Sequence, residues 1–119
     1  MKVFNLIVWL ENCDSDSTIA RVHEYDVAAN KKECALFLEE QEMHDVGLSD
    51  EELKQIDDVL KGVTKVKPDI LFNDDHVSVW GTNKELMIDV VIDWFEEHQE
   101  FFQIIEFSVI TKQLQLLKG

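Results

Sequence analysis

The chain has 119 residues, and its 25 acidic side chains outnumber the 11 basic ones, which gives a formal net charge of −14. With 45% hydrophobic residues, one Pro and four Gly, it has the composition of a folded domain with a single core. The acidic excess argues strongly against direct binding to nucleic acid or to an anionic membrane, because phosphate groups are bound by Lys and Arg. We therefore expect one domain over residues 1–119 with a surface that attracts cationic partners.

The first apolar run, residues 2–10, superficially resembles a signal peptide. It lacks the small residues of a cleavage site and is followed at once by Glu11. We interpret it as a strand and expect the protein to be cytoplasmic. In that compartment Cys13 and Cys34 are expected to remain reduced thiols.

The N-terminal half predicts two strands and a helix. Residues 2–10 are apolar and rich in β-branched and aromatic residues, which favours a central strand buried on both faces. Residues 18–27 alternate and predict a second strand, antiparallel to the first. Asn30 is the N-cap of a helix that ends near Met43, with Glu33 as its capping-box partner.

The next helix has the clearest start signal in the chain. Ser49 is a good N-cap, and Glu52 stands three residues later as the second member of a capping box. Gly62 is expected at the C′ position, where a left-handed backbone conformation ends a helix. Asp57 and Lys61 are spaced i,i+4 on this helix, so here an exposed acid has a basic partner along the chain.

The C-terminal half predicts a hairpin, a helix and a strand. Residues 70–72 and 77–80 flank a turn, Thr82 caps an acidic helix, and residues 102–110 alternate as a last strand. The resulting order is β-β-α-α-β-β-α-β, which predicts a two-layer α+β domain with helices packed against a mostly antiparallel sheet. The three tryptophans, Trp9, Trp80 and Trp94, are expected in the core. The sequence also allows one of them to be an interface anchor, without selecting which.

The sequence contains no motif for catalysis, cofactor binding or metal binding. The glycines are isolated, and neither a CxxC nor an HExxH pattern occurs. Residues 14–18 are compatible with calcium binding, and residues 73–76 with metal ligation or acid–base work, although ordinary turn chemistry explains both segments. We therefore predict no catalytic residue, no cofactor and no metal, and a protein that is not an enzyme.

The charge pattern of residues 85–100 is the most informative feature. On a helical wheel its acids fall within an arc of ~120°, and the opposite side is apolar. No Lys or Arg occurs between Lys84 and Lys112. Like charges at i,i+4 spacing destabilise a helix, so we interpret this face as one that presents negative charge to a partner. The predicted partner-binding residues are Glu85, Asp89, Asp93, Glu96, Glu97 and Glu100.

A second acidic region extends over residues 39–58. If it lies on a helix next to residues 85–100, the two regions form one large negative patch.

Three functions remain open on this pattern. The first hypothesis is an immunity protein or antitoxin that neutralises a basic, nuclease-type toxin through the acidic helix. The second is a phage-type DNA mimic, such as an anti-restriction or anti-CRISPR inhibitor. The third is a small ligand-binding or enzymatic domain whose acids only keep it soluble. The first two imply a basic protein as the partner.

Overall fold

The computed structural model describes residues 1–9, 20–44, 48–63, 67–72, 76–98, 100 and 104–118. In chain order its elements are β1 (Lys2–Trp9), β2 (Ala20–Asp26), α1 (Lys31–His44), α2 (Asp50–Leu60), β3 (Leu71–Phe72), β4 (His76–Gly81), α3 (Lys84–Glu97) and α4 (Ile104–Lys118). The described strands form one antiparallel sheet in the order β2-β1-β4-β3. The predicted α+β class, the antiparallel sheet and the central position of the first strand are confirmed.

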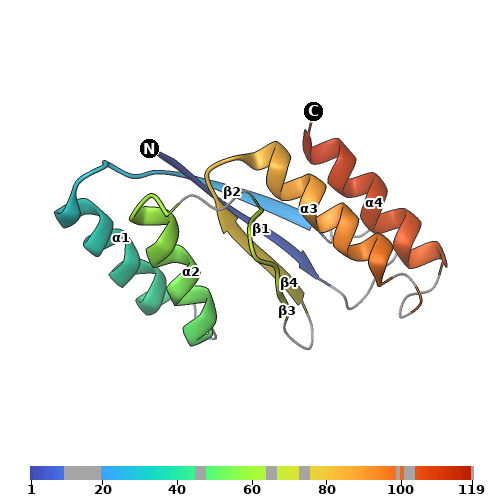
Figure 1. Ribbon diagram of the computed structural model, residues 1–119, viewed down its shortest axis with the longest axis horizontal. Coiled ribbons are helices and arrows are strands. Elements are labelled where there is room, and N and C mark those ends of the chain that lie inside the picture. The colour runs from blue at the N-terminus through green and yellow to red at the C-terminus, as the bar shows by residue number, and fades with distance from the viewer. Residues whose placement is uncertain are drawn as a thin grey trace.

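Helices cover both faces of this sheet, so the domain has three layers where the sequence predicted two (Figure 1). Successive side chains of a strand point to opposite faces. On β4, Val79 belongs to the core under α3 and α4, whereas its neighbour Trp80 belongs to the core under α1 and α2. On β1, Leu6 belongs to the core under α3 and α4, and Val3 belongs to the core under α1 and α2. Because both faces of the central strands are apolar, each face needs its own pair of helices.

The last element is a helix, and the predicted strand over residues 102–110 is wrong from residue 104 onward. α4 continues through Lys118 and buries Ile110 and Leu114, which are spaced i,i+4, in the core with α3. The strand was predicted from a short alternation over residues 102–110, whereas Ile110, Leu114 and Leu117 recur at helical spacing and pack in the core, and a short alternating run does not exclude a helix. The α4 length of 15 residues is typical of a helix.

The caps of α1 and α2 are confirmed. The Asn30 side chain accepts a hydrogen bond from the Glu33 N–H at 2.9 Å, and the Ser49 hydroxyl accepts one from the Glu52 N–H at 3.2 Å. Gly62 has φ of +73° and ends α2 in a left-handed conformation. Lys61 pairs with Asp57 at 2.6 Å, and this hydrogen bond together with the charge of Asp57 raises the pKa of Lys61.

The N-cap of α3 lies one residue later than predicted. The Asn83 side chain accepts a hydrogen bond from the Leu86 N–H at 3.0 Å, in the position that the sequence assigned to Thr82. Both residue types cap helices, and they are adjacent, so the sequence offered two starts of similar quality. The structure selects the later one, which places Glu85 inside the first turn of the helix.

Replacing Asn83 by Ala is expected to destabilise the fold by about 1 kcal/mol, because the Leu86 N–H then loses its acceptor. Thr82→Ala is the matched control and should change stability by less than about 0.5 kcal/mol. Urea unfolding followed by circular dichroism measures both values. A larger loss for Thr82→Ala than for Asn83→Ala would restore the start predicted from the sequence.

The predicted hairpin is present as β3 and β4, in which Leu71 pairs with Ser78 and Phe72 with Val77. Beyond this short pairing, a side chain of α2 bonds to β4 in place of β3: the Gln55 Oε1 accepts a hydrogen bond from the Trp80 N–H at 2.9 Å. Every helix in the described ranges falls short of the length and apolar character that a membrane crossing requires.

Candidate partner-binding surface

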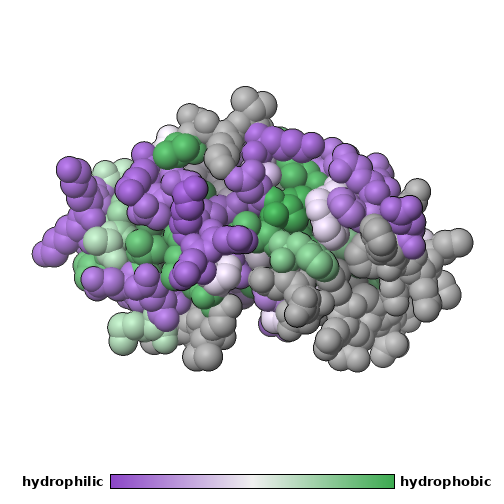
Figure 2. All heavy atoms as spheres, turned by 60° about the horizontal axis from the view of Figure 1, so that its bottom comes forward, coloured by the Kyte–Doolittle hydropathy of each residue, from purple (hydrophilic) through white to green (hydrophobic). Residues whose placement is uncertain are grey.

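The acidic residues predicted to bind a partner are all exposed, on one side of α3 and just beyond its end: Glu85, Asp89, Asp93, Glu96, Glu97 and Glu100. The opposite side of α3 is buried in the core, with Ile88, Val91 and Phe95 fully covered. The helix is therefore amphipathic in the way the wheel predicted, with carboxylates on solvent and apolar side chains on the sheet. Figure 2 shows a face of the molecule on which hydrophilic side chains cover much of the described surface, with apolar side chains exposed between them.

One of these acids has a partner that the sequence did not predict. Lys118, in the last turn of α4, forms an ion pair with Asp89. The acidic face has no basic neighbour in the sequence, but it has one in the folded protein, because α4 packs beside α3. Both side chains are substantially exposed, so this pair contributes at most about 1 kcal/mol. Within the described residues, the other five acids of the face take part in no ion pair.

The two acidic regions do not form the single patch that the sequence allowed. The described acids of residues 39–58 lie on α1 and α2, on one face of the sheet, and α3 covers the opposite face (Figure 1). α1 carries Glu39, Glu40 and Glu42 in exposed positions, far in the fold from the carboxylates of α3. The molecule therefore presents negative charge on two separate helical surfaces.

A cavity of about 300 Å³ lies between α2, β4 and the start of α3, beyond the end of β3. Apolar side chains from four elements line it: Val59, Leu71, Trp80, Leu86 and Met87. The lining also includes three carboxylates and one basic residue: Glu51, Asp58, Asp69 and Lys54. The volume is at the small end of the range for ligand sites, ~300–1,000 Å³. An apolar cavity with this lining suits a small group that is partly apolar and partly cationic.

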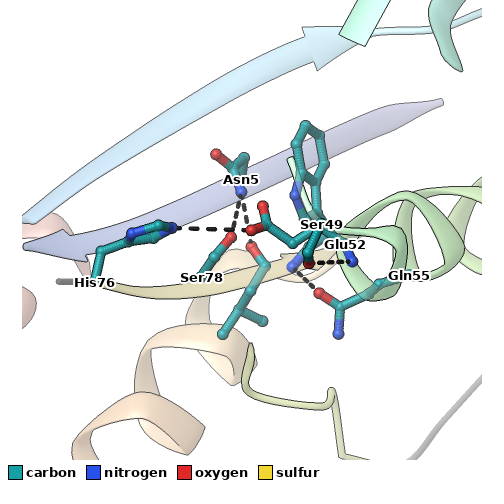
Figure 3. A network of polar contacts seen from close by, with 8 residues as sticks. Asn5, Ser49, Glu52, Gln55, His76 and Ser78 are labelled. Atoms are coloured by element: carbon teal, nitrogen blue, oxygen red, sulfur yellow. Dashed lines mark hydrogen bonds and ion pairs between the residues drawn. The ribbon is translucent and has the colours of Figure 1, made fainter. Parts of the chain in front are cut away.

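A buried polar network joins α2 to the sheet (Figure 3). The Glu52 carboxylate is 3% exposed, and its Oε1 lies 3.9 Å from Nε2 of the half-buried His76. Asn5 Nδ2 donates to the Ser78 hydroxyl and to the Val79 carbonyl, each at 3.3 Å. The sequence placed Glu52 only as a capping residue and His76 only in a turn. It gave no signal for their approach, because they lie 24 positions apart in the numbering and on different elements.

This network has the residue types of an acid–base site but not its access. Ser78 is 1% exposed, so a substrate has no route to its hydroxyl. The ring centroid of Trp9 lies 4.9 Å from that of His76, so Trp9 packs against the imidazole of the network. A buried carboxylate that is hydrogen-bonded or paired fixes the position of its helix, and we interpret the network as the polar contact that holds α2 on the sheet.

The tryptophans divide between core and surface. Trp80 is buried, as predicted, and its ring packs with those of Tyr25 and Phe37. Trp9 is 41% exposed, and Trp94 is half-buried at the edge of the acidic face, so the prediction of a core position is wrong for Trp9 and only partly right for Trp94. The difference arises because a strand end and a helix border each leave one side of a large ring uncovered.

Two segments were considered as metal sites from the sequence. In the part of the chain that the structure describes, no three His, Cys, Asp or Glu side chains lie close enough together to hold a metal ion. The calcium candidate at residues 14–18, and Cys13 before it, lie outside the described residues, as do residues 73–75 of the second candidate. Cys34 is a free thiol packed beside the core under α1 and α2. Its Sγ lies 3.6 Å from the Ala28 carbonyl oxygen, in an environment typical of a structural cysteine.

Comparison of the chain with protein-family models, with curated protein sequences and with solved structures found no match. The function is therefore argued from the surface and its chemistry.

Proposed function

We propose that this protein is an inhibitor of a basic protein, an immunity protein or antitoxin that neutralises a nuclease-type toxin through the acidic face of α3. One observation carries the proposal. Five carboxylates are exposed together on one side of α3 and a sixth, Glu100, lies just beyond its end, and within the described residues only Asp89 has a basic partner. The residues proposed to contact the toxin are Glu85, Asp89, Asp93, Glu96, Glu97 and Glu100.

The arrangement of these acids has a cost to the protein, which supports a role outside folding. Asp93 lies four residues from both Asp89 and Glu97, and each such like-charge pair destabilises a helix by about 0.2–0.5 kcal/mol. Glu96 and Glu97 occupy the last turn, where negative charge opposes the helix dipole and no basic residue compensates. On α2, by contrast, Asp57 is paired with Lys61. A partner that brings Lys or Arg side chains removes the repulsion on α3.

Electrostatic attraction explains why an inhibitor benefits from this surface. A nuclease binds phosphates through Lys and Arg side chains, and the carboxylates of α3 offer those side chains a competing set of anions. Complementary charge also raises the rate of association, up to 10²–10³-fold above that of uncharged surfaces. Such a protein acts by binding and not by catalysis, in the cytoplasm of the cell that makes both proteins.

The test is affinity purification of the tagged full-length protein from its source cells, with elution in rising salt. We expect one basic protein to be retained in stoichiometric amount up to about 0.5 M salt, where interactions between exposed charges are screened within about 4–5 Å. The recovered protein is then assayed for nuclease activity with and without the inhibitor. Recovery of no basic protein, or of one whose activity the chain leaves unchanged, contradicts the proposal.

A DNA mimic is the second candidate, and the exposed acids of α1 favour it. Glu39, Glu40 and Glu42 extend negative charge beyond α3 to the other side of a molecule that is 45 Å long. A mimic of the phosphate backbone needs charge spread over several surfaces. It should retain many nucleic-acid-binding proteins and release them at moderate salt, because its binding is largely electrostatic. The salt steps of the same purification therefore distinguish the two functions.

A further inference from the structure

Three aromatic rings form a row along one border of the acidic face. Phe72 of β3 is 57% exposed, and its ring centroid lies 5.6 Å from that of Trp94 on α3. The Trp94 ring stacks on His98 at 4.3 Å, with 21° between the two planes. We name Phe72, Trp94 and His98 the aromatic row.

The aromatic row borders the carboxylates on the side away from α4. Asp89, within the acidic face, is paired with Lys118 of α4, whereas Trp94 contacts β3 through Phe72. Glu97 lies three residues after Trp94, and residues with that spacing are neighbours on a helix surface, about 5–6 Å apart at Cβ. The exposed ring of Phe72 and the exposed Glu97 therefore both neighbour Trp94, where α3 contacts the edge strand β3.

This pairing of groups matches one side chain better than any other. The guanidinium of Arg is planar, stacks on aromatic rings and forms two parallel hydrogen bonds with a carboxylate. The ammonium of Lys is a compact, strongly hydrated charge, without the flat surface that stacks on a ring or the two parallel donors that match a carboxylate. Nucleobases also stack on exposed aromatic rings, but the phosphates that accompany them are repelled by the carboxylates of α3.

We infer that the aromatic row is an arginine-binding site, in which a guanidinium of the basic partner stacks on Phe72 and bonds to the carboxylates of α3. The inference rests on the proposed function, because it assumes that the acidic face binds a basic protein. It adds a specificity that charge alone does not provide, since the site discriminates between arginine and lysine.

The experiment compares two peptides, hexa-arginine and hexa-lysine, titrated into the full-length protein at matched ionic strength. We expect hexa-arginine to bind about threefold to fivefold more tightly, the gain typical of an exposed cation–π contact. Phe72→Leu keeps an apolar side chain and removes the π-face, so it should reduce this ratio to near one while leaving the affinity for hexa-lysine unchanged. Trp9→Leu is the matched control, because Trp9 is an exposed aromatic side chain that packs on His76 and makes no ring contact with the aromatic row.

The outcomes separate this inference from the proposed function. A ratio that falls in Phe72→Leu and persists in Trp9→Leu supports the arginine site. Equal affinity of the two peptides for the native protein, or a ratio that Phe72→Leu leaves unchanged, overturns the site and leaves an acidic surface that binds basic proteins. Binding of neither peptide at low salt contradicts the proposed function itself, and the arginine site with it.

Discussion

Neutralising Asp93, Glu96 and Glu97 together is expected to weaken binding of the basic partner by about 100-fold or more, which corresponds to about 2.8 kcal/mol. Truncating one member of a desolvated interfacial charge pair costs about 2–5 kcal/mol, so one such pair among the three already accounts for the loss. The variant is Asp93→Asn, Glu96→Gln and Glu97→Gln, and it leaves the ion pair between Asp89 and Lys118 intact. Isothermal titration against the partner recovered by purification measures the change.

The same variant should fold as well as the native protein or better. It removes the repulsion between Asp93 and Glu97, and it removes negative charge from the last turn of α3, each worth a few tenths of a kcal/mol. Urea unfolding should therefore show an unchanged or higher free energy of unfolding. A clear loss of stability would mean that these carboxylates contribute to the fold and are not held ready for a partner.

The matched control places the same change of charge on α1, as Glu39→Gln, Glu40→Gln and Glu42→Gln. These side chains are also exposed, and α1 covers the opposite face of the sheet from α3. An inhibitor that binds through α3 should lose little affinity in the control. An equal loss in both variants would show that binding follows the net charge of the molecule, as expected for a DNA mimic.

Replacing Phe95 by Ala is expected to reduce the free energy of unfolding by about 3–5 kcal/mol, which is a large fraction of the 5–15 kcal/mol of a typical domain. Phe95 has no exposed surface and lies in the core between α3, α4 and the sheet, with its ring in edge contact with Trp94 at 5.0 Å. Its removal leaves a cavity that the neighbouring elements fill only in part. Thermal and urea unfolding measure the loss.

Phe72→Ala provides the comparison, because it removes the same side chain from an exposed position. It should change stability by no more than about 1 kcal/mol. If the two substitutions destabilised the protein equally, the assignment of Phe95 to the core and of Phe72 to the surface would be wrong.

Signals that act within one helical turn were predicted correctly in most cases. Ser49 and Asn30 cap their helices, and Gly62 ends α2 with a positive φ, because each effect involves only backbone groups a few residues away. The amphipathic pattern of α3 has the same local origin, since helical periodicity alone divides its carboxylates from its core side chains. The cap at Asn83 shows the limit of such signals, because Thr82 beside it is almost as good a candidate.

Contacts between distant elements were not predictable in this way. Whether residues 104–118 pair as a strand or pack as a helix depends on where the apolar surface of α3 and the sheet remains uncovered, and residue spacing does not encode that. The ion pair of Lys118 with Asp89, the approach of Glu52 to His76, and the contact of Phe72 with Trp94 each join residues that lie far apart in the chain.

The sequence by itself therefore determined the charge of this protein, the α+β class, the ends of most elements and the acidic face of α3. These properties follow from composition and from interactions between near neighbours in the chain. Only the tertiary structure decided that the two acidic regions occupy opposite faces of the sheet, that Trp80 is core while Trp94 borders the surface, and that an aromatic row lies beside the carboxylates. These features depend on how helices pack on the two faces of one sheet, and that packing brings together residues whose distance along the chain carries no information about their contact.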